Sequence, residues 1–111
     1  MDESNNKYKL QYLPIFYEDL YDKVTYILEV LNNKDAANEL VNAIENAIIK
    51  RLPIAESFEK YQSRVDRTQP YYRIFIGNFV IYYVVIEDET QGKIMEIRRF
   101  LYNRQNRDRI L

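Results

Sequence analysis

Residues 79–86 read FVIYYVVI, a run in which every residue is apolar or aromatic. Aromatic and β-branched residues favour strands, and a strand that lacks alternation with polar residues is typically buried on both faces. This run therefore constrains the fold more than any other part of the chain. We predict that it forms the central strand of a sheet, with much of both faces covered.

Three further segments are predicted to be strands. Residues 71–76 meet the central strand through a Gly-Asn pair at 77–78, and both residue types tolerate the positive φ of a tight hairpin turn. Residues 93–101 follow the central strand after a longer polar turn at 87–92. Near the start of the chain, residues 7–13 alternate between apolar and polar side chains, as a half-buried strand does.

Between these strands the apolar residues recur at steps of three and four, which indicates amphipathic helices. Residues 15–31 carry one such stripe. A second stripe ends near Leu52, and Asp35 is predicted to cap the N-terminus of this second helix. The connection between the two is short, so we expect an antiparallel helical hairpin. Residues 53–70 show no sustained period and are predicted to be a loop with one short turn.

The predicted order of elements is β-αα-βββ, in a single domain that spans residues 1–111. A strand, a helical hairpin and three consecutive strands define an α+β fold. We expect both helices to pack on one face of a small, mainly antiparallel, four-stranded sheet.

The composition disfavours several classes of chemistry. The chain has no cysteine and no histidine, which removes disulfides, thiolate metal sites, the usual general base and Ser–His or Cys–His nucleophiles. A redox, zinc or triad enzyme is not expected, and neither is a cofactor or a metal. No stretch approaches the roughly 20 apolar residues that span a bilayer, and the N-terminus is acidic and polar. A cytoplasmic protein without a membrane partner is therefore predicted.

The charges are unevenly distributed, although the net charge is −1. Residues 1–49 hold nine acids and four lysines, a net charge of −5, whereas residues 50–111 hold twelve basic residues and eight acids, a net charge of +4. The last fourteen residues concentrate five arginines beside a single acid: Arg98, Arg99, Arg104, Arg107 and Arg109 beside Asp108. Guanidinium groups form paired hydrogen bonds with phosphates and carboxylates, so this segment is predicted to bind anions.

The order of elements and three sequence segments resemble the RelE/ParE toxins of bacterial type II toxin–antitoxin systems. The likeness covers nearly the whole chain, through NNKDAANELVNAIENAI at the helical hairpin, YYRIFIGNFVIYYVV at the strand hairpin and IRRFLYNRQNRDRIL at the end. The resemblance implies a toxin that a cognate antitoxin protein neutralises by wrapping around its sheet and helices. Many members of this family cleave messenger RNA on the ribosome, and a ParE-like branch poisons DNA gyrase.

The resemblance also implies site residues. Tyr102 stands where the family often has histidine or tyrosine, Arg104 where an arginine commonly follows, and Arg73 where a basic residue often precedes the turn. These three are the predicted catalytic residues, and the predicted substrate-binding residues are other arginines near the end: Arg98, Arg99 and Arg107. The chain departs from the ribonuclease members at Val80, where they usually carry an arginine, and in its lack of histidine.

The predicted activity is growth inhibition, foremost by ribosome-dependent mRNA cleavage as a metal-independent endoribonuclease. That reaction is attack of a 2′-hydroxyl on its adjacent phosphate, which needs a base, an acid and cations. Tyr102 would donate a proton or stack on an RNA base, and the arginines would hold the phosphate. The candidate bases are Glu87, Asp88 and Glu96. Two alternatives remain open: a gyrase inhibitor without nuclease activity, and a non-catalytic domain that binds an antitoxin.

Structural roles are the other explanation for several of these residues. Tyr102 would pack its ring at a sheet edge and keep its hydroxyl in water. Because adjacent strand residues point to opposite faces, Arg98 and Arg99 are not expected to join one site, and the one outside it would pair with a surface acid. The paired tyrosines of the strands are expected to pack rather than to stack on bases. The acids of the first helix are expected on its solvated face: Glu18, Asp19 and Asp22.

Overall fold

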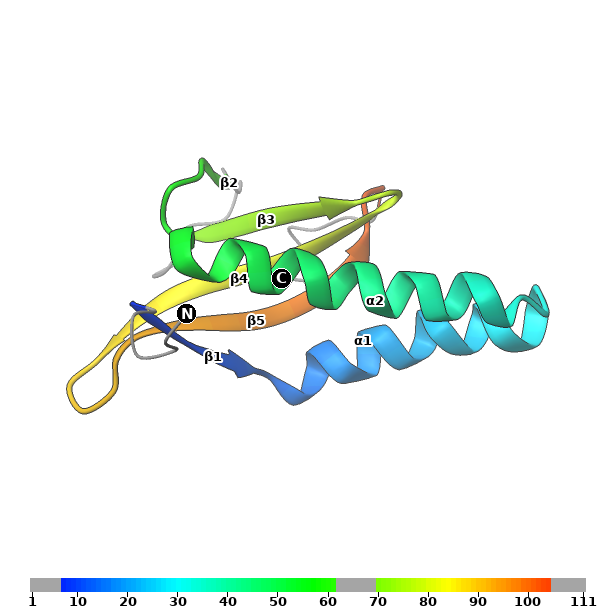
Figure 1. Cartoon of the computed structure of the whole chain (residues 1–111), viewed down its shortest axis with the longest axis horizontal. Coiled ribbons are helices and arrows are strands. Elements are labelled where there is room, and N and C mark those ends of the chain that lie inside the picture. Colours follow the sequence, from blue (N-terminus) through cyan, green and yellow to red (C-terminus); the bar gives the residue numbers. More distant parts are fainter. Residues whose placement is uncertain (1–6, 62–69, 105–111) are drawn as a thin grey trace.

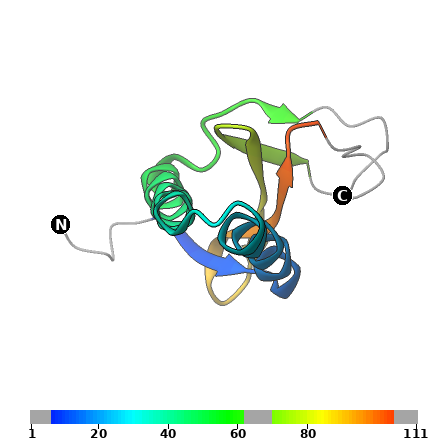
Figure 2. The same ribbon diagram turned by 90° about the vertical axis from the view of Figure 1, so that its right-hand side faces the viewer.

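The computed structural model of the chain describes residues 7–61 and 70–104 (Figure 1). The fold is α+β, as predicted, with two helices packed on a sheet (Figures 1 and 2). The elements follow in the order β1 (Tyr8–Tyr12), α1 (Pro14–Thr25), the π-helical turn η2 (Tyr26–Val30), α2 (Lys34–Arg51), the 3-10 turn η3 (Leu52–Ile54), β2 (Lys60–Tyr61), β3 (Tyr71–Ile76), β4 (Phe79–Asp88) and β5 (Gly92–Tyr102).

The sheet has five strands in the order β1-β5-β4-β3-β2, whereas four were predicted. β4 lies in the middle, which confirms residues 79–86 as the core of a central strand. β1 runs parallel to β5 and the other neighbours are antiparallel, so the sheet is mixed. The additional strand is β2, whose two residues pair with β3 inside the segment predicted to be a loop. A strand of two residues has no apolar period by which it could be recognised.

The helical hairpin covers one face of the sheet and extends past the ends of the strands (Figures 1 and 2). α1 begins at Pro14, whose fixed φ suits the first turn of a helix. It continues into η2, and the chain then reverses through Asn32, at a φ of 51°. Asn33 caps α2, because its side-chain oxygen accepts a hydrogen bond of 3.0 Å from the backbone N–H of Ala36. The predicted cap, Asp35, is wrong: this residue lies inside the first turn of the helix.

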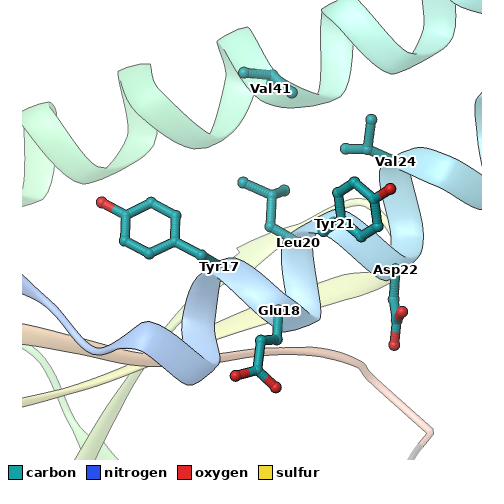
Figure 3. Close-up of a pocket in the computed structure, with 7 residues that line it drawn as sticks. All are labelled: Tyr17, Glu18, Leu20, Tyr21, Asp22, Val24 and Val41. Atoms are coloured by element: carbon teal, nitrogen blue, oxygen red, sulfur yellow. The ribbon is translucent and has the colours of Figure 1, made fainter.

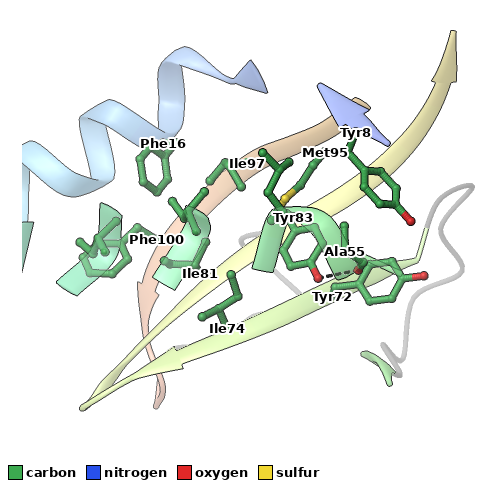
Figure 4. Packing of buried hydrophobic residues seen from close by; sticks show 13 residues of the cluster. Tyr8, Phe16, Ala55, Tyr72, Ile74, Ile81, Tyr83, Met95, Ile97 and Phe100 are labelled. Atoms are coloured by element: carbon green, nitrogen blue, oxygen red, sulfur yellow. Dashed lines mark hydrogen bonds between the residues drawn. The ribbon is translucent and has the colours of Figure 1, made fainter. Parts of the chain in front are cut away.

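The main core lies between the sheet and the helices (Figure 4). Tyr83 of β4 stacks on Tyr72 of β3 with ring centroids 5.2 Å apart, and its hydroxyl donates a hydrogen bond of 2.7 Å to the carbonyl oxygen of Ala55. These tyrosines pack as predicted. The helices add buried apolar side chains from their inner faces: Phe16, Ile44 and Ile48.

A second, smaller cluster of buried residues covers the other face of β4. It consists of Tyr71, Val80, Tyr82, Val84 and Leu101. The members on β4 alternate with the main-core residues Ile81 and Tyr83, and all of them are fully buried. β4 is therefore buried on both faces, which confirms what its unbroken apolar sequence predicts.

Candidate functional site

β5 ends next to the turn that joins β3 and β4. That turn begins with Gly77 at a φ of 55°, a conformation that favours glycine. Tyr102, the last residue of β5, pairs with Phe79, the first residue of β4. The backbone N–H of Asn103 donates a hydrogen bond of 2.8 Å to the carbonyl oxygen of Asn78. The end of β5 is therefore fixed against the turn.

A pocket of about 500 Å³ opens at this end of the sheet and is lined by Asn78, Tyr102, Asn103 and Arg104. The structure thus brings together two of the predicted catalytic residues, Tyr102 and Arg104. Tyr102 is 40 % exposed, and its ring lies 4.9 Å from the ring of Phe79. The pocket offers a guanidinium, two side-chain amides and an accessible aromatic ring, which are groups that bind phosphates and nucleobases. We call it the Tyr102 pocket.

Lys23, in the last turn of α1, is a further cation beside the Tyr102 pocket. Its Nζ lies 5.2 Å from the centroid of the Tyr102 ring, and the residue is only 7 % exposed. Burial lowers the pKa of Lys23, although Asp19 and Asp22 act in the opposite direction. The sequence gives no sign of this role for Lys23, because a lysine near the end of an amphipathic helix is ordinarily solvated.

Arg73 lies on the opposite face of the sheet from Tyr102. It pairs with Tyr82 of β4, whereas Tyr102 pairs with Phe79, and these two partners stand an odd number of residues apart on the strand. The Arg73 guanidinium is 4.9 Å from the centroid of the Tyr61 ring. The three predicted catalytic residues are therefore not joined in a single site.

A β-bulge in β5 accounts for this separation. The pairing with β4 passes from Ile97 directly to Arg99, so Arg98 is an extra residue on β5. One extra residue in a strand moves every later side chain of that strand to the opposite face of the sheet. The bulge thereby places Tyr102 on the helix side of the sheet, and the simple alternation predicted for Arg98 and Arg99 is wrong at this point.

Arg99 is held by Asp19 of α1. Its Nε and Nη2 donate hydrogen bonds of 2.7 and 2.8 Å to the two carboxylate oxygens, and the backbone N–H of Phe100 adds a third at 3.0 Å. These contacts with Asp19 raise the pKa of Arg99 above its ordinary value. The expectation that Asp19 lies on a solvated helix face is wrong, because α1 runs along the part of β5 that β1 leaves uncovered. Glu18 and Asp22 are exposed, as expected.

Arg98 is held by Glu96, the buried candidate base. Arg98 Nε donates to Oε2 of Glu96 at 2.8 Å, and Gln11 Nε2 donates to Oε1 at 2.6 Å. Both carboxylate oxygens of Glu96 are therefore engaged within the chain. The two arginines that were predicted to bind substrate in β5 are each paired with an acid of the same chain.

The other two candidate bases lie at the far end of β4 from Tyr102. Glu87 and Asp88 are the last residues of that strand. Asp88 accepts hydrogen bonds from the hydroxyl of Thr90 and from the backbone N–H groups of Thr90 and Gln91, and these bonds lower the pKa of Asp88. Asp88 therefore stabilises the turn before β5. Among the described residues that line the Tyr102 pocket there is no carboxylate.

Val80, the position at which a phosphate-binding arginine is expected in the resembled ribonucleases, is fully buried in the second cluster. It contacts neither solvent nor the Tyr102 pocket. Arg107, the remaining predicted substrate-binding residue, lies outside the described residues.

A second hollow, of about 720 Å³, lies between α1 and α2 (Figure 3). Tyr17 and Tyr21 stand one turn apart on α1 and are 53 % and 71 % exposed. In Figure 3 the carboxylates of Glu18 and Asp22 point away from α2, so the outer border of the hollow is acidic. The rest of the lining is apolar: Leu20, Val24 and Val41. We call this feature the hairpin groove, and its shape and composition suit the apolar face of a partner helix.

Comparison with known proteins found no family model that matches the chain and no curated protein that matches it. In the part of the chain that the structure describes, no helix is long and apolar enough to cross a membrane. The same part contains no group of three or more acidic side chains that could hold a metal ion.

Proposed function

We propose that this chain is the toxin of a type II toxin–antitoxin pair with RelE/ParE-like architecture, and that it acts through the Tyr102 pocket. The observation that carries the proposal is the presence of Tyr102 and Arg104 in one accessible pocket at the end of β5. A ring beside a guanidinium suits single-stranded nucleic acid, because a base stacks on the ring while the guanidinium binds a phosphate. Messenger RNA on the ribosome is the first proposed target.

Cleavage at this pocket would require attack of an RNA 2′-hydroxyl on the adjacent phosphate. Arg104 would stabilise the negative charge that develops on the phosphate, and Tyr102 would donate a proton to the leaving 5′ oxygen. A carboxylate base is missing from the described lining of the pocket, and Arg73 faces the other side of the sheet. The geometry therefore supports RNA binding more directly than RNA cleavage.

The second candidate function is inhibition of DNA gyrase without any nuclease activity. The lack of a carboxylate in the described lining of the Tyr102 pocket favours it, and so does the burial of Val80. In this case the Tyr102 pocket would bind an anionic surface of the gyrase–DNA complex. Arg104 would contribute charge to that contact, and no bond would be broken by the toxin itself.

The hairpin groove supports the proposal of a protein partner, the cognate antitoxin. Tyr17 and Tyr21 expose aromatic surface that a soluble monomer gains nothing from exposing, and the groove between the helices can accept an apolar helix face. Replacing Tyr21 with alanine is expected to weaken binding of the antitoxin at least about tenfold, since aromatic anchors dominate such interfaces. Ile49→Ala, which alters an exposed apolar residue of α2 that does not line the groove, is the matched control.

Growth after induced expression tests the proposed site. The unaltered chain should arrest growth in cells without the antitoxin, and Tyr102→Phe and Arg104→Ala should each relieve the arrest while antitoxin binding stays within about threefold. Lys50→Ala removes an exposed cation at the end of α2 and should leave the arrest intact. Growth arrest that persists in both pocket variants would refute the assignment of the Tyr102 pocket as the toxic site. Normal growth of cells that express the unaltered chain without the antitoxin would refute the toxin proposal.

The target is identified by primer extension on messenger RNA during induction, together with an assay for gyrase-linked DNA breaks. Cuts at defined codon positions without DNA damage are expected for the first function. DNA breaks with intact messages would establish the second function instead. Growth arrest with neither effect would exclude both targets.

A further inference from the structure

Lys23 carries a buried charge that no carboxylate of the described residues neutralises by direct contact. It is 7 % exposed, in the last turn of α1, and its Nζ is 5.2 Å from the centroid of the Tyr102 ring. Within residues 7–61 and 70–104, no carboxylate oxygen lies within 4.0 Å of this ammonium group. Lysine is almost never buried to this extent without a partner, because removing an ammonium group from water is costly.

The nearest acid on the same helix face, Asp19, is already committed elsewhere. Both of its oxygens accept hydrogen bonds from Arg99, and one of them also accepts the backbone N–H of Phe100. Asp22 is exposed to solvent, where its charge is screened. Arg99 adds a like charge to the surroundings of Lys23. Asp19 and Asp22 thus favour the charged form of Lys23 from a distance, and neither carboxylate contacts its ammonium group.

The Lys23 ammonium group lies beside the Tyr102 pocket, which adds the guanidinium of Arg104 and the side-chain amides of Asn78 and Asn103. Tyr102 connects the two features, because its ring contacts Lys23 and also forms a wall of the pocket. A buried cation acts over several ångströms in a medium of low dielectric constant, so it contributes to anion binding without touching the anion.

We propose that Lys23 is a positioning residue of the Tyr102 pocket: it holds the Tyr102 ring from α1 and supplies buried positive charge for a phosphate group bound beside Arg104. The ligand class is a phosphate ester, either the backbone of a single-stranded RNA or a terminal phosphate. This inference deepens the proposed function and rests on it for the role of the pocket. It also explains why a lysine, rather than an apolar residue, occupies a buried position of α1.

The test is equilibrium binding of two probes to the purified chain: a single-stranded RNA tetranucleotide without terminal phosphates, and inorganic phosphate. Shifts of the Tyr102 ring resonances report binding at the pocket. Lys23→Met, which keeps an unbranched side chain one atom shorter and removes its charge, should raise the dissociation constants about tenfold. Lys23→Arg should restore them to within about threefold of the unaltered chain. Lys34→Met, at the start of α2 and exposed, should have no effect. Preference for the tetranucleotide identifies the RNA backbone as the source of the phosphate.

Stability separates an electrostatic role from a merely structural one. Removal of a buried charge should leave Lys23→Met at least as stable to urea as the unaltered chain, so that weaker binding is accompanied by equal or greater stability. Unchanged affinity in Lys23→Met would overturn the inference, and so would an equal loss in Lys23→Arg. Growth arrest by a chain that binds neither probe would overturn the inference and leave the toxin proposal standing. Binding with the expected pattern but without growth arrest would support the inference about Lys23 and refute the toxin proposal.

Discussion

Asp19 of α1 holds Arg99 of β5 with both carboxylate oxygens, at 2.7 Å from Nε and 2.8 Å from Nη2. The pairing of β1 with β5 ends at Ile97, so the next amides on that edge of β5 have no strand beside them. Asp19 takes the place of a strand there by accepting the backbone N–H of Phe100 at 3.0 Å. This single side chain therefore fastens the helical hairpin to the sheet at the point where the candidate site begins.

Asp19→Ala is expected to destabilise the fold by about 3 kcal/mol, because it removes the carboxylate that accepts hydrogen bonds from a largely buried guanidinium and from a backbone N–H. The side chains of Arg99 and Asp19 are only 16 % and 10 % exposed, so little solvent screens the pair. Urea unfolding monitored by circular dichroism measures the loss. Asp22→Ala, one turn away and exposed, should cost less than about 0.5 kcal/mol. Similar losses in the two variants would contradict this role of Asp19.

The sequence predicts most of the fold because the period of its apolar residues changes clearly between strands and helices. The unbroken run at 79–86 correctly identifies the central strand, since only a strand covered on both faces can lack polar residues. The two-residue strand β2 leaves no such trace. The contact of Asp19 with β5 likewise cannot be predicted from the apolar period, because an acid that covers a sheet edge has the same position in that period as an acid that faces water.

The candidate site is only half predictable from the sequence, and the β-bulge at Arg98 is the physical reason. Tyr102 and Arg104 are close in the chain, so their meeting in one pocket follows from local geometry. Without the extra residue in β5, the alternation of faces would carry Tyr102 to the side of the sheet that holds Arg73. Bulges depend on tertiary packing, and the same shift brings Tyr102 to Lys23 of α1.

The hydroxyl of Tyr83 is expected to matter more for stability than its position in an apolar strand suggests. It donates to the carbonyl oxygen of Ala55 at 2.7 Å and accepts a hydrogen bond of 2.9 Å from Nη1 of Arg51. Tyr83→Phe takes this donor from the Ala55 carbonyl oxygen and leaves Arg51 Nη1 only its hydrogen bond to the carbonyl oxygen of Arg73, so it should cost about 1–3 kcal/mol in urea unfolding. Tyr72→Phe is the matched control, because Tyr72 stacks on the same ring and its hydroxyl makes no hydrogen bond to another described residue. A larger loss in the control than in Tyr83→Phe would exclude this explanation.

The N-terminus of α2 offers a direct comparison between the predicted cap and the observed one. Asn33→Ala removes the acceptor of the Ala36 N–H and should cost about 1 kcal/mol. Asp35→Ala removes only a favourable interaction with the helix dipole and should cost about 0.5 kcal/mol or less at moderate salt. Thermal unfolding of the two variants at the same salt concentration measures the difference. If Asp35→Ala proves the more destabilising, the observed capping geometry is not the one that stabilises the helix.

Glu56 should make the stability of the fold depend on pH. Lys93 Nζ and the Tyr8 hydroxyl donate hydrogen bonds to Glu56 Oε1 at 2.7 and 2.8 Å, and these bonds lower the pKa of Glu56. A carboxyl group whose pKa is lower in the folded state stabilises the fold above its ordinary pKa, and the contribution is lost as the pH falls through the folded-state value.

Glu56→Gln removes this titration. The variant should be less stable than the unaltered chain at neutral pH, and the difference should shrink as the pH is lowered from about 7 to below the ordinary glutamate pKa of about 4.3, because the native carboxylate becomes protonated. Urea midpoints measured across this range test the expectation, with Glu59→Gln, an exposed neighbour, as the control. A difference between the two chains that stays constant down to the lowest pH would show that Glu56 contributes shape or hydrogen bonding independent of its charge.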